Sequence, residues 1–222
     1  MKRFDFDQYS EQWWAVRRGI PTASEMSKIM SPVARKFSTS AMGYICQLIG
    51  DLYDPMYGRH DEYASAAMKN GSMLEPEARK FYEWDRGVDV EQVGFCLSDC
   101  GRYGCSPDAL VGDDGGLELK SPAHKTHVQW LWENVLPDEH KVQVHGCLIV
   151  TGRAWWDFMS YAPGLPPLLI RVTPDDFTDD LRTALEKFST LYANVVDRLK
   201  LPPPPVMDTH EYTEADIPAM LS

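Results

Sequence analysis

Two short stretches of the sequence carry residue types that could bind a metal ion and activate water. Asp108 follows Ser106-Pro107 near the end of one predicted strand, and Glu118 and Lys120 lie two residues apart on the next. Side chains two residues apart leave the same face of a strand. The Asp-Asp-Gly-Gly sequence at 113–116 predicts a hairpin turn that brings Asp108 beside Glu118. Two carboxylates and an amine would then share one cleft.

This group of residues is suited to hydrolysis assisted by divalent cations. The carboxylate oxygens of Asp108 and Glu118 are the hard ligands that Mg²⁺ and Mn²⁺ prefer. Such ions lower the pKa of a bound water and neutralise charge that develops on phosphorus, while Lys120 could hold or deprotonate the water. Alternatively, Asp108 caps a bend, and Glu118 and Lys120 form an exposed pair without a catalytic role.

The remaining pattern predicts a central sheet flanked by helices. Ser10 or Asp7 caps the first helix, Thr22 and Glu25 match a capping box, and Thr173 or Asp175 caps the last helix. Helices are expected over 8–19, 22–30, 40–53, 63–86, 124–134, 138–150 and from the last cap to 199. Strands are expected over 88–97, 103–111, 117–120, 153–161 and 168–172. This order of elements indicates an α/β fold.

Composition narrows the class of protein. The 222 residues are 44% hydrophobic, with no apolar run long enough for a membrane span and an acidic residue where a secretion signal needs an apolar core. We expect one domain over 1–201, then a proline-rich linker and acidic tail over 202–222, in a cytoplasmic protein. The 22 basic and 33 acidic residues give a net charge of −11, which argues against a nucleic-acid partner unless basic residues gather locally.

Three further blocks surround the possible catalytic motif. They are Trp-Trp-Ala-Val-Arg-Arg-Gly-Ile-Pro-Thr-Ala-Ser at 13–24, Gly-Ser-Met-Leu-Glu-Pro-Glu-Ala-Arg at 71–79 and Gln-Val-His-Gly-Cys-Leu-Ile-Val-Thr-Gly at 143–152. With the Pro-Asp…Glu-X-Lys signature of the PD-(D/E)XK nuclease superfamily, the set resembles the phage lambda-type alkaline exonucleases, or YqaJ-like viral recombinases. The resemblance implies a restriction-endonuclease-like core with a central mixed β-sheet.

The resemblance also implies an activity. Members of this family are Mg²⁺-dependent 5′-to-3′ exonucleases that processively degrade one strand of linear double-stranded DNA, releasing 5′-mononucleotides and leaving a 3′ single strand for recombination. The implied protein is a homotrimeric ring from a phage or prophage, acting in the bacterial cytoplasm beside a single-strand annealing recombinase. Two Mg²⁺ ions are expected, and Mn²⁺ could substitute.

Roles in the active centre follow from matching motif positions. Asp108, Glu118 and the Leu119 carbonyl resemble the metal ligands, and Lys120 resembles the residue that activates water. Glu75 resembles a helix glutamate that reaches a metal directly or through water, and Gln143 resembles the helix glutamine beside the active centre.

Other matched positions imply contacts with DNA. Arg17, Ser24 and Ser106 would bind the terminal 5′-phosphate, since a guanidinium fork with two hydroxyls suits a dianion. Arg18 is the rival for the arginine role. Trp13 falls where the family places an aromatic wedge, although one of the two adjacent tryptophans could equally be a core residue. Further contacts with DNA are expected from Trp13, Arg18, Arg35 and Lys36.

The sequence departs from the family in one motif and offers no second cofactor. His145 stands where glutamine is usual, and a buried, hydrogen-bonded role is favoured for it; His124 and His127 are expected on a helix surface. The cysteines lack the spacing of a zinc or iron–sulfur site, and no phosphate loop for ATP is present. An endonuclease or nickase of the same fold and a non-catalytic DNA-binding ring module are the alternative functions.

Overall fold

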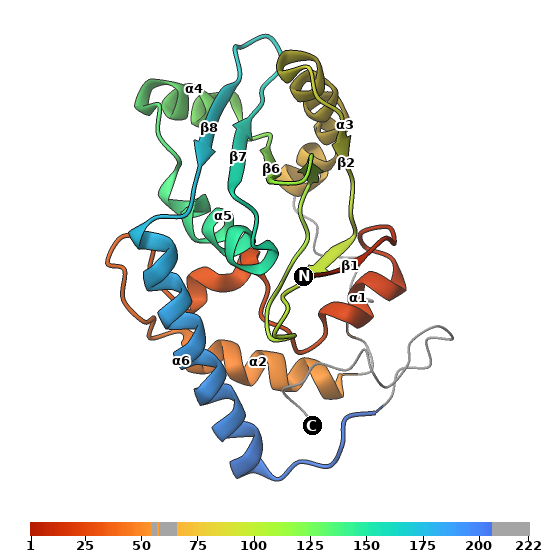
Figure 1. Ribbon diagram of the computed structural model, residues 1–222, viewed down its shortest axis with the longest axis vertical. Coiled ribbons are helices and arrows are strands. Elements are labelled where there is room, and N and C mark those ends of the chain that lie inside the picture. Colours follow the sequence, from red (N-terminus) through yellow and green to blue (C-terminus); the bar gives the residue numbers. More distant parts are fainter. Residues whose placement is uncertain (55–56, 58–65, 206–222) are drawn as a thin grey trace.

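The computed structural model describes residues 1–54, 57 and 66–205 as a mixed sheet with helices packed on both faces, and a smaller sheet beside it (Figure 1). The predicted acidic tail and the start of the helix expected from residue 63 lie outside these residues. The helices are α1 (Glu11–Arg17), the 3₁₀ helix η1 (Ala23–Lys28), α2 (Ala41–Tyr53), α3 (Ala66–Arg86), α4 (His124–Glu133), α5 (Asp138–Thr151) and α6 (Asp176–Leu199). The strands are β1 (Lys2–Phe4), β2 (Val90–Glu91), β3 (Phe95–Leu97), β4 (Gly104–Cys105), β5 (Ala109–Val111), β6 (Gly115–Lys120), β7 (Trp155–Ser160) and β8 (Leu168–Val172).

The larger sheet confirms the predicted α/β class with a central mixed sheet. Its five strands lie in the order β2-β5-β6-β7-β8, and every neighbouring pair is antiparallel except β6 and β7. The parallel pair needs a crossover, which α4 and α5 provide. The smaller sheet has the order β1-β3-β4.

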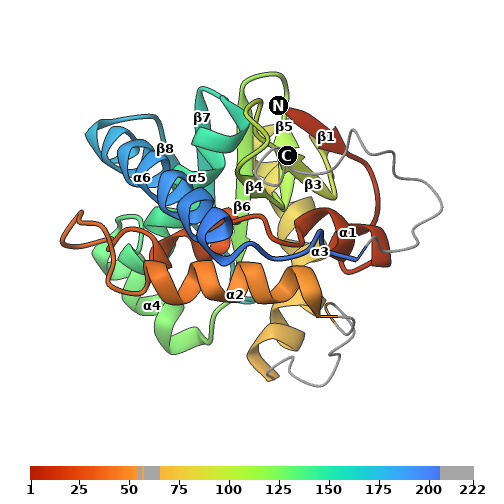
Figure 2. The same ribbon diagram turned by 90° about the horizontal axis from the view of Figure 1, so that it is seen from below.

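The two faces of the larger sheet bury different clusters. On one face, Ala78 and Tyr82 of α3 pack against Leu117 and Leu119 of β6. On the other face, residues of α4, α5 and α6 pack against Leu110, Trp156 and Phe158. Because side chains alternate along a strand, Glu118 and Lys120 leave β6 on the side of α5. Helices α2 and α6 pack together beyond this layer (Figure 2).

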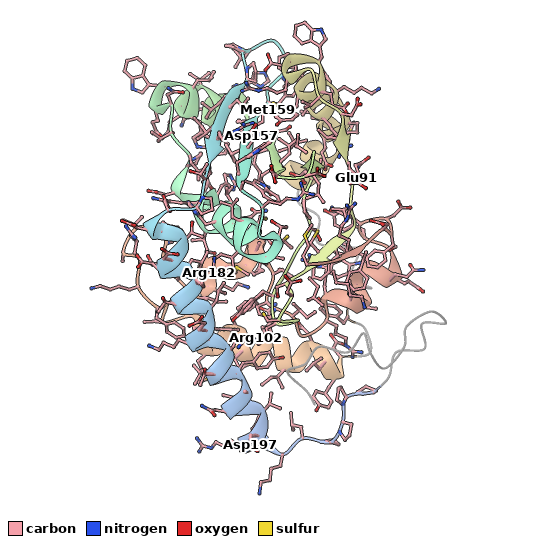
Figure 3. The ribbon with its side chains drawn as sticks, in the orientation of Figure 1. Glu91, Arg102, Asp157, Met159, Arg182 and Asp197 are labelled. Carbon is pink, nitrogen blue, oxygen red and sulfur yellow. The ribbon has the colours of Figure 1, made fainter. Side chains whose placement is uncertain are left out.

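A buried acidic side chain fastens α3 to the sheet. Asp157 of β7 is 1% exposed, accepts a 2.8 Å hydrogen bond from the Tyr82 hydroxyl of α3, and binds both Nε and Nη2 of Arg171 on β8. Figure 3 shows Asp157 within the sheet beside Met159. A paired and hydrogen-bonded carboxylate can be buried without an uncompensated charge. Through this contact, the helix that carries Glu75 has a defined position on the sheet.

Two predicted strands are each divided between the two sheets. The expected strand at 88–97 breaks into β2 and β3 at Gly94, where a Cβ would lie 2.1 Å from the Phe6 carbonyl oxygen, so the chain packs backbone on backbone. The expected strand at 103–111 breaks into β4 and β5 around Pro107, which has no N–H to donate to a ladder. Ser106 and Asp108 therefore lie at the junction of the sheets.

Helix caps also differ from the prediction in one case. Ser10 caps α1 by accepting from the Trp13 amide, and Asp175 caps α6 in a complete capping box. Thr22, however, makes no side-chain cap bond; its amide donates to the Tyr44 hydroxyl and a 3₁₀ helix follows. The predicted capping box at Thr22 is therefore wrong.

Within the described parts of the chain, no helix combines the length and apolar character that crossing a membrane needs.

The glycines expected to form the hairpin turn belong to β6 instead. Gly115 and Gly116 pair in parallel with Trp155 and Trp156, and a Cβ at either glycine would lie within 2.1–2.3 Å of the indole opposite. The turn is formed earlier, at Gly112, with a φ of +52°. These glycines are therefore needed for space beneath two tryptophans and not for a left-handed backbone.

Replacement of Gly116 by alanine should destabilise the fold by about 1–3 kcal/mol, the usual cost of forcing extra volume into a packed core. Gly43→Ala is the matched control, because nothing lies within 4 Å of a Cβ there and alanine favours helix. Urea unfolding of both variants measures the difference. Equal stabilities would contradict the packing role of Gly116.

Candidate active site

The centre of the site is the place where the β5–β6 ladder ends. The register Ala109↔Leu117 places Asp108 opposite Glu118. Beyond it the chain turns at Pro107, and the Asp108 Oδ2 atom accepts the Leu119 amide at 2.5 Å. The N–H and C=O of one strand residue face the same neighbour, so the Leu119 carbonyl lies on the Asp108 side of β6. The predicted meeting of Asp108 and Glu118 is confirmed.

Glu118 is the most deeply buried of these carboxylates, with 1% of the residue exposed. Its Oε1 atom accepts 2.5 Å hydrogen bonds from Lys120 Nζ and from Gln143 Nε2, which projects from α5. Its Oε2 atom is buried and has no hydrogen-bond partner among the described residues. One oxygen is therefore held in place, and the other is available to a ligand.

The local electrostatics reflect charges that are removed from water. Burial raises the pKa of Glu118 to about 7, although the Lys120 ammonium opposes this shift. Burial also raises the pKa of Asp108, and of Glu75, for which the Asp108 charge adds to the effect. Burial lowers the pKa of Lys120, but the Glu118 and Asp108 carboxylates outweigh it and the net shift is upward. Lys120 is thus a charged donor beside two carboxylates.

The donor set fits a hard divalent cation that keeps several waters. The unpartnered Glu118 Oε2, the Asp108 carboxylate and the Leu119 carbonyl offer oxygen ligands of the type that Mg²⁺ prefers. Among the described residues, no cluster of three or more His, Cys, Asp or Glu side chains forms a complete metal cage. A partly hydrated ion held by two carboxylates and one carbonyl agrees with both observations.

Glu75 lies near this centre, but its carboxylate binds Arg79 and not a residue of the Asp108–Glu118 group. Its carboxylate pairs with Arg79, one turn further along α3. Ala78 of the same helix packs in one buried cluster with Ala109 and Leu119, which places this part of α3 beside Asp108 and Glu118. Arg79 was not predicted from the sequence, although the Glu-X-X-X-Arg spacing on a helix indicates such a pair.

The expected phosphate pocket is partly assembled. Arg17 Nη1 donates to Ser106 Oγ at 3.0 Å, and Trp13 Nε1 donates to the same oxygen at 2.8 Å. The Arg17 Nε atom is buried without a partner among the described residues, and burial lowers the pKa of this arginine. Ser24 is exposed and bonds to Thr22; no hydrogen bond joins it to Arg17 or Ser106 in the described chain.

Two residues predicted to contact DNA have structural roles. Arg18 is 8% exposed and donates to the backbone carbonyls of Asp51 and Asp54 at the end of α2. Trp13 is 5% exposed and stacks beneath the Arg17 guanidinium, whose carbon lies 4.0 Å from the ring centre. Both side chains are therefore engaged within the fold, and the DNA contact of Arg18 and the wedge role of Trp13 stay predictions.

Arg35 and Lys36 lie on an exposed loop near the start of α6. Arg35 pairs with Asp180 of that helix, and its guanidinium lies 5.8 Å from the Phe177 ring centre. Lys36 is exposed. Contact of these two residues with DNA stays a prediction.

The histidines separate into buried and exposed residues. His145 is 1% exposed, and its Nδ1 shares a 2.8 Å hydrogen bond with the Thr178 hydroxyl, so the buried role favoured for it is confirmed. His127 is fully buried between Ser160 and the Pro166 carbonyl, which makes the surface position predicted for it wrong. His124 is exposed, as predicted.

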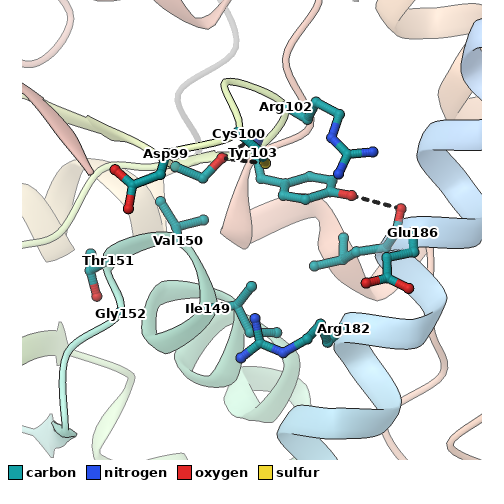
Figure 4. A pocket seen from close by; sticks show the side chains of 12 residues that line it. Asp99, Cys100, Arg102, Tyr103, Ile149, Val150, Thr151, Gly152, Arg182 and Glu186 are labelled. Carbon is teal, nitrogen blue, oxygen red and sulfur yellow. Dashed lines mark hydrogen bonds between the residues drawn. The ribbon is translucent and has the colours of Figure 1, made fainter.

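A separate cavity of about 260 Å³ lies between the β3–β4 turn, the end of α5, and α6 (Figure 4). Cys100, Arg102, Arg182 and Glu186 are among its lining residues, and none of the residues placed in the active centre is. Cys46 and Cys100 are exposed, whereas Cys96, Cys105 and Cys147 are buried; all five are free thiols.

His140, which packs against Phe158 on the α5 side of the sheet, gives the protein a specific response to acid. Burial, with the Lys120 charge, lowers the pKa of His140 to about 3. In the unfolded chain His140 takes up a proton at higher pH than in the folded chain. The contribution of neutral His140 to the free energy of unfolding is therefore full above its pKa in the unfolded chain. This contribution is lost as the pH falls toward 3.

Urea unfolding at pH 7 and pH 5 should therefore show that wild-type protein loses stability relative to His140→Leu as pH falls. The variant lacks the His140 imidazole, and the effects of pH on all other titrating groups are the same in both proteins and cancel in the difference. A constant difference in unfolding free energy across this range would contradict a partly buried, neutral His140.

The fold and the carboxylate–lysine cluster at the end of the central strand β6 define a restriction-endonuclease-like core. The chain belongs to the family described as the YqaJ-like viral recombinase domain, which matches residues 12–154. It is similar to an alkaline exonuclease, LHK-Exo, from Laribacter hongkongensis, with 30% identity and a TM-score of 0.73 over 86% of this chain and 96% of that chain. LHK-Exo in complex with dAMP matches at 31% identity and the same TM-score.

A more distant likeness extends to the fold alone. A phage-related exonuclease from Haemophilus somnus 129PT is 12% identical, with a TM-score of 0.60 over 81% of this chain and 96% of that chain. No curated protein sequence matches this chain.

Proposed function

We propose that this protein is a Mg²⁺-dependent exonuclease that degrades the 5′ strand of linear double-stranded DNA, releasing 5′-mononucleotides and leaving a 3′ strand for recombination. Its family and its likeness to an alkaline exonuclease support a nuclease that acts on DNA. The contact between Arg17 and Ser106 supports the rest of the proposal, because it would form a cationic pocket for a terminal phosphate two residues from Asp108.

The spacing of this pocket from the carboxylates supports removal of one nucleotide at a time. Ser106 and Asp108 are two residues apart, so their Cα atoms are separated by at most about 7 Å. A terminal phosphate held by Arg17 and Ser106 would place the next phosphodiester bond near Asp108 and Glu118. An enzyme that cuts internal bonds would have no use for such a pocket.

The residues of the centre have separate tasks in this proposal. Asp108, Glu118 and the Leu119 carbonyl would hold Mg²⁺, which when bound lowers the pKa of water and offsets charge on phosphorus. Lys120 donates a hydrogen bond that orients the attacking water. Gln143 keeps Glu118 Oε1 occupied, so Oε2 would remain available to the ion.

A processive enzyme of this kind would form a ring. We propose a homotrimer threaded by DNA, with Arg35 and Lys36 among the residues that face the duplex, and a single-strand annealing recombinase as partner for the 3′ strand. A ring that encircles DNA stays on it without many contacts between basic side chains and phosphates. An acidic protein with a net charge of −11 could therefore remain bound to DNA in this way. Sedimentation at low micromolar concentration tests the trimer.

Digestion of end-labelled linear duplex, with and without a 5′-phosphate, in Mg²⁺ or in chelator, tests the activity. The proposal requires Mg²⁺-dependent release of 5′-mononucleotides from 5′-phosphorylated ends. Cutting of closed circular duplex would instead favour an endonuclease or nickase. Binding without nucleotide release would favour a non-catalytic module.

Lys120→Ala should reduce cleavage by at least ~10²-fold, because the attacking water loses its charged donor. DNA binding and assembly should persist, since Lys120 is partly exposed and its hydrogen bond lies within the site. Single-turnover cleavage and duplex binding in Ca²⁺ measure the two effects. Near-normal turnover would exclude the assigned role of Lys120.

Arg17→Ala should slow digestion of 5′-phosphorylated ends by roughly 10–100-fold, on the scale of roughly 1.5–3 kcal/mol for a hydrogen bond to a charged group. The defect should be much smaller on 5′-hydroxyl ends, which have no dianion to lose. Equal defects on both substrates would reject the phosphate pocket even if nuclease activity remains.

Arg18→Ala is the adjacent control. Because Arg18 binds the carbonyls of Asp51 and Asp54, its loss should lower the thermal stability of the protein without changing the preference for phosphorylated ends.

A further inference from the structure

A second cation lies near the candidate active centre and has no role in the proposed chemistry so far. Arg79 is on α3, one turn after Glu75, and 12% of its side chain is exposed. Ala78, the residue before Arg79, lies in one buried cluster with Ala109 and Leu119, which directly follow Asp108 and Glu118 in the sequence. Arg79 therefore approaches the proposed metal ligands from the α3 face of the sheet. In agreement with this position, its guanidinium opposes the upward shift that burial imposes on the pKa of Asp108.

The hydrogen-bonding capacity of Arg79 is largely unused. A guanidinium has five N–H donors. In the described chain, its one hydrogen bond is from Nη2 to Glu75 Oε1, and its Nε atom is buried without a partner. Buried donors are normally satisfied, so an unpartnered one beside the proposed metal ligands is open to an acceptor from a substrate.

The other cation near the metal ligands, Lys120, already has a task in the proposed function: its Nζ binds Glu118 Oε1 and donates to the attacking water. Arg79 has four further N–H donors and no task so far. The three acidic side chains Glu75, Asp108 and Glu118 would repel a phosphodiester unless cations faced it. A planar guanidinium suits phosphate oxygens better than an ammonium does, because two parallel hydrogen bonds can form.

We propose that Arg79 is a catalytic residue that binds a non-bridging oxygen of the scissile phosphate, with Glu75 holding its guanidinium in place through Nη2. The inference rests on the proposed nuclease function and adds a substrate contact to it. Arg79 then offsets charge on the phosphate as water attacks, which is where a preorganised donor contributes most to rate.

A metal-free binding experiment tests the contact. In chelator, wild-type protein should bind 5′-phosphorylated duplex several-fold more tightly than the same duplex whose first internucleotide linkage is a neutral methylphosphonate. Arg79→Met should bind both alike, and Arg79→Lys should keep a reduced preference. Arg86→Met, at the exposed end of the same helix, is the matched control and should behave as wild type. An unchanged preference in Arg79→Met would overturn the proposal.

Single-turnover cleavage in Mg²⁺ separates a contact with substrate from an effect through Glu75. Arg79→Met should be slower by about 10²-fold, the cost of removing one donor to a developing charge, and Arg79→Lys should recover part of the loss. The loss in Arg79→Met should persist when the Mg²⁺ concentration is raised, because the missing contact is with the phosphate. If a higher Mg²⁺ concentration restores Arg79→Met to the wild-type rate, Arg79 acts only through Glu75 and metal binding, and the proposal fails.

Different results would reject the nuclease function and the role of Arg79. Wild-type protein that releases nucleotides, together with an Arg79→Met variant that cleaves equally fast, would reject the role of Arg79 and keep the nuclease function. Wild-type protein that releases no nucleotides with Mg²⁺ would reject both. Thermal melting confirms folding of each variant, and Arg79→Lys carries the binding test if Arg79→Met does not fold.

Discussion

The hydrogen bond from the Leu119 amide to Asp108 is the interaction on which the candidate site depends. It forms where the regular strand pairing ends: the Pro107 carbonyl accepts from Gln8 Nε2 at 3.0 Å, and the aspartate side chain accepts the Leu119 amide instead. The bond fixes Asp108 opposite Glu118, directs the Leu119 carbonyl to the same side, and leaves Lys120 at the end of the strand. The same break in the chain places Ser106 against Arg17.

Concentrating charge in this way acts against folding, and the rest of the structure offsets it. Three carboxylates with raised pKa values lie close together, so their mutual repulsion and desolvation oppose the compact state. Two features hold α3 and α5 beside the site in spite of this repulsion. They are the apolar clusters on both sheet faces and the contacts of Asp157 with Arg171 and Tyr82. A bound cation would relieve the repulsion and couple metal binding to stability.

The sequence was most informative where local chemistry dominates. Helix ends at Ser10 and Asp175 followed from capping side chains, and the juxtaposition of Asp108 and Glu118 followed from strand alternation and a short connection. The predicted strand boundaries were wrong where the backbone of a distant residue packs against the strand, as the Phe6 carbonyl does at Gly94. The Gly115–Gly116 pair looked like a turn because its tryptophan neighbours lie some forty residues away along the chain. Burial of Arg18 and His127 likewise depends on packing that no local pattern carries.

The central claim is that Asp108 and Glu118 form a site for Mg²⁺, and thermal unfolding with and without the ion tests it most directly. A ligand that binds only the folded state raises the melting temperature. Wild-type protein should melt at higher temperature as Mg²⁺ is added, and Glu118→Gln, which keeps an Oε1 acceptor for Lys120 and Gln143, should show no such rise. An equal rise in both proteins, or none in wild type, would contradict the account.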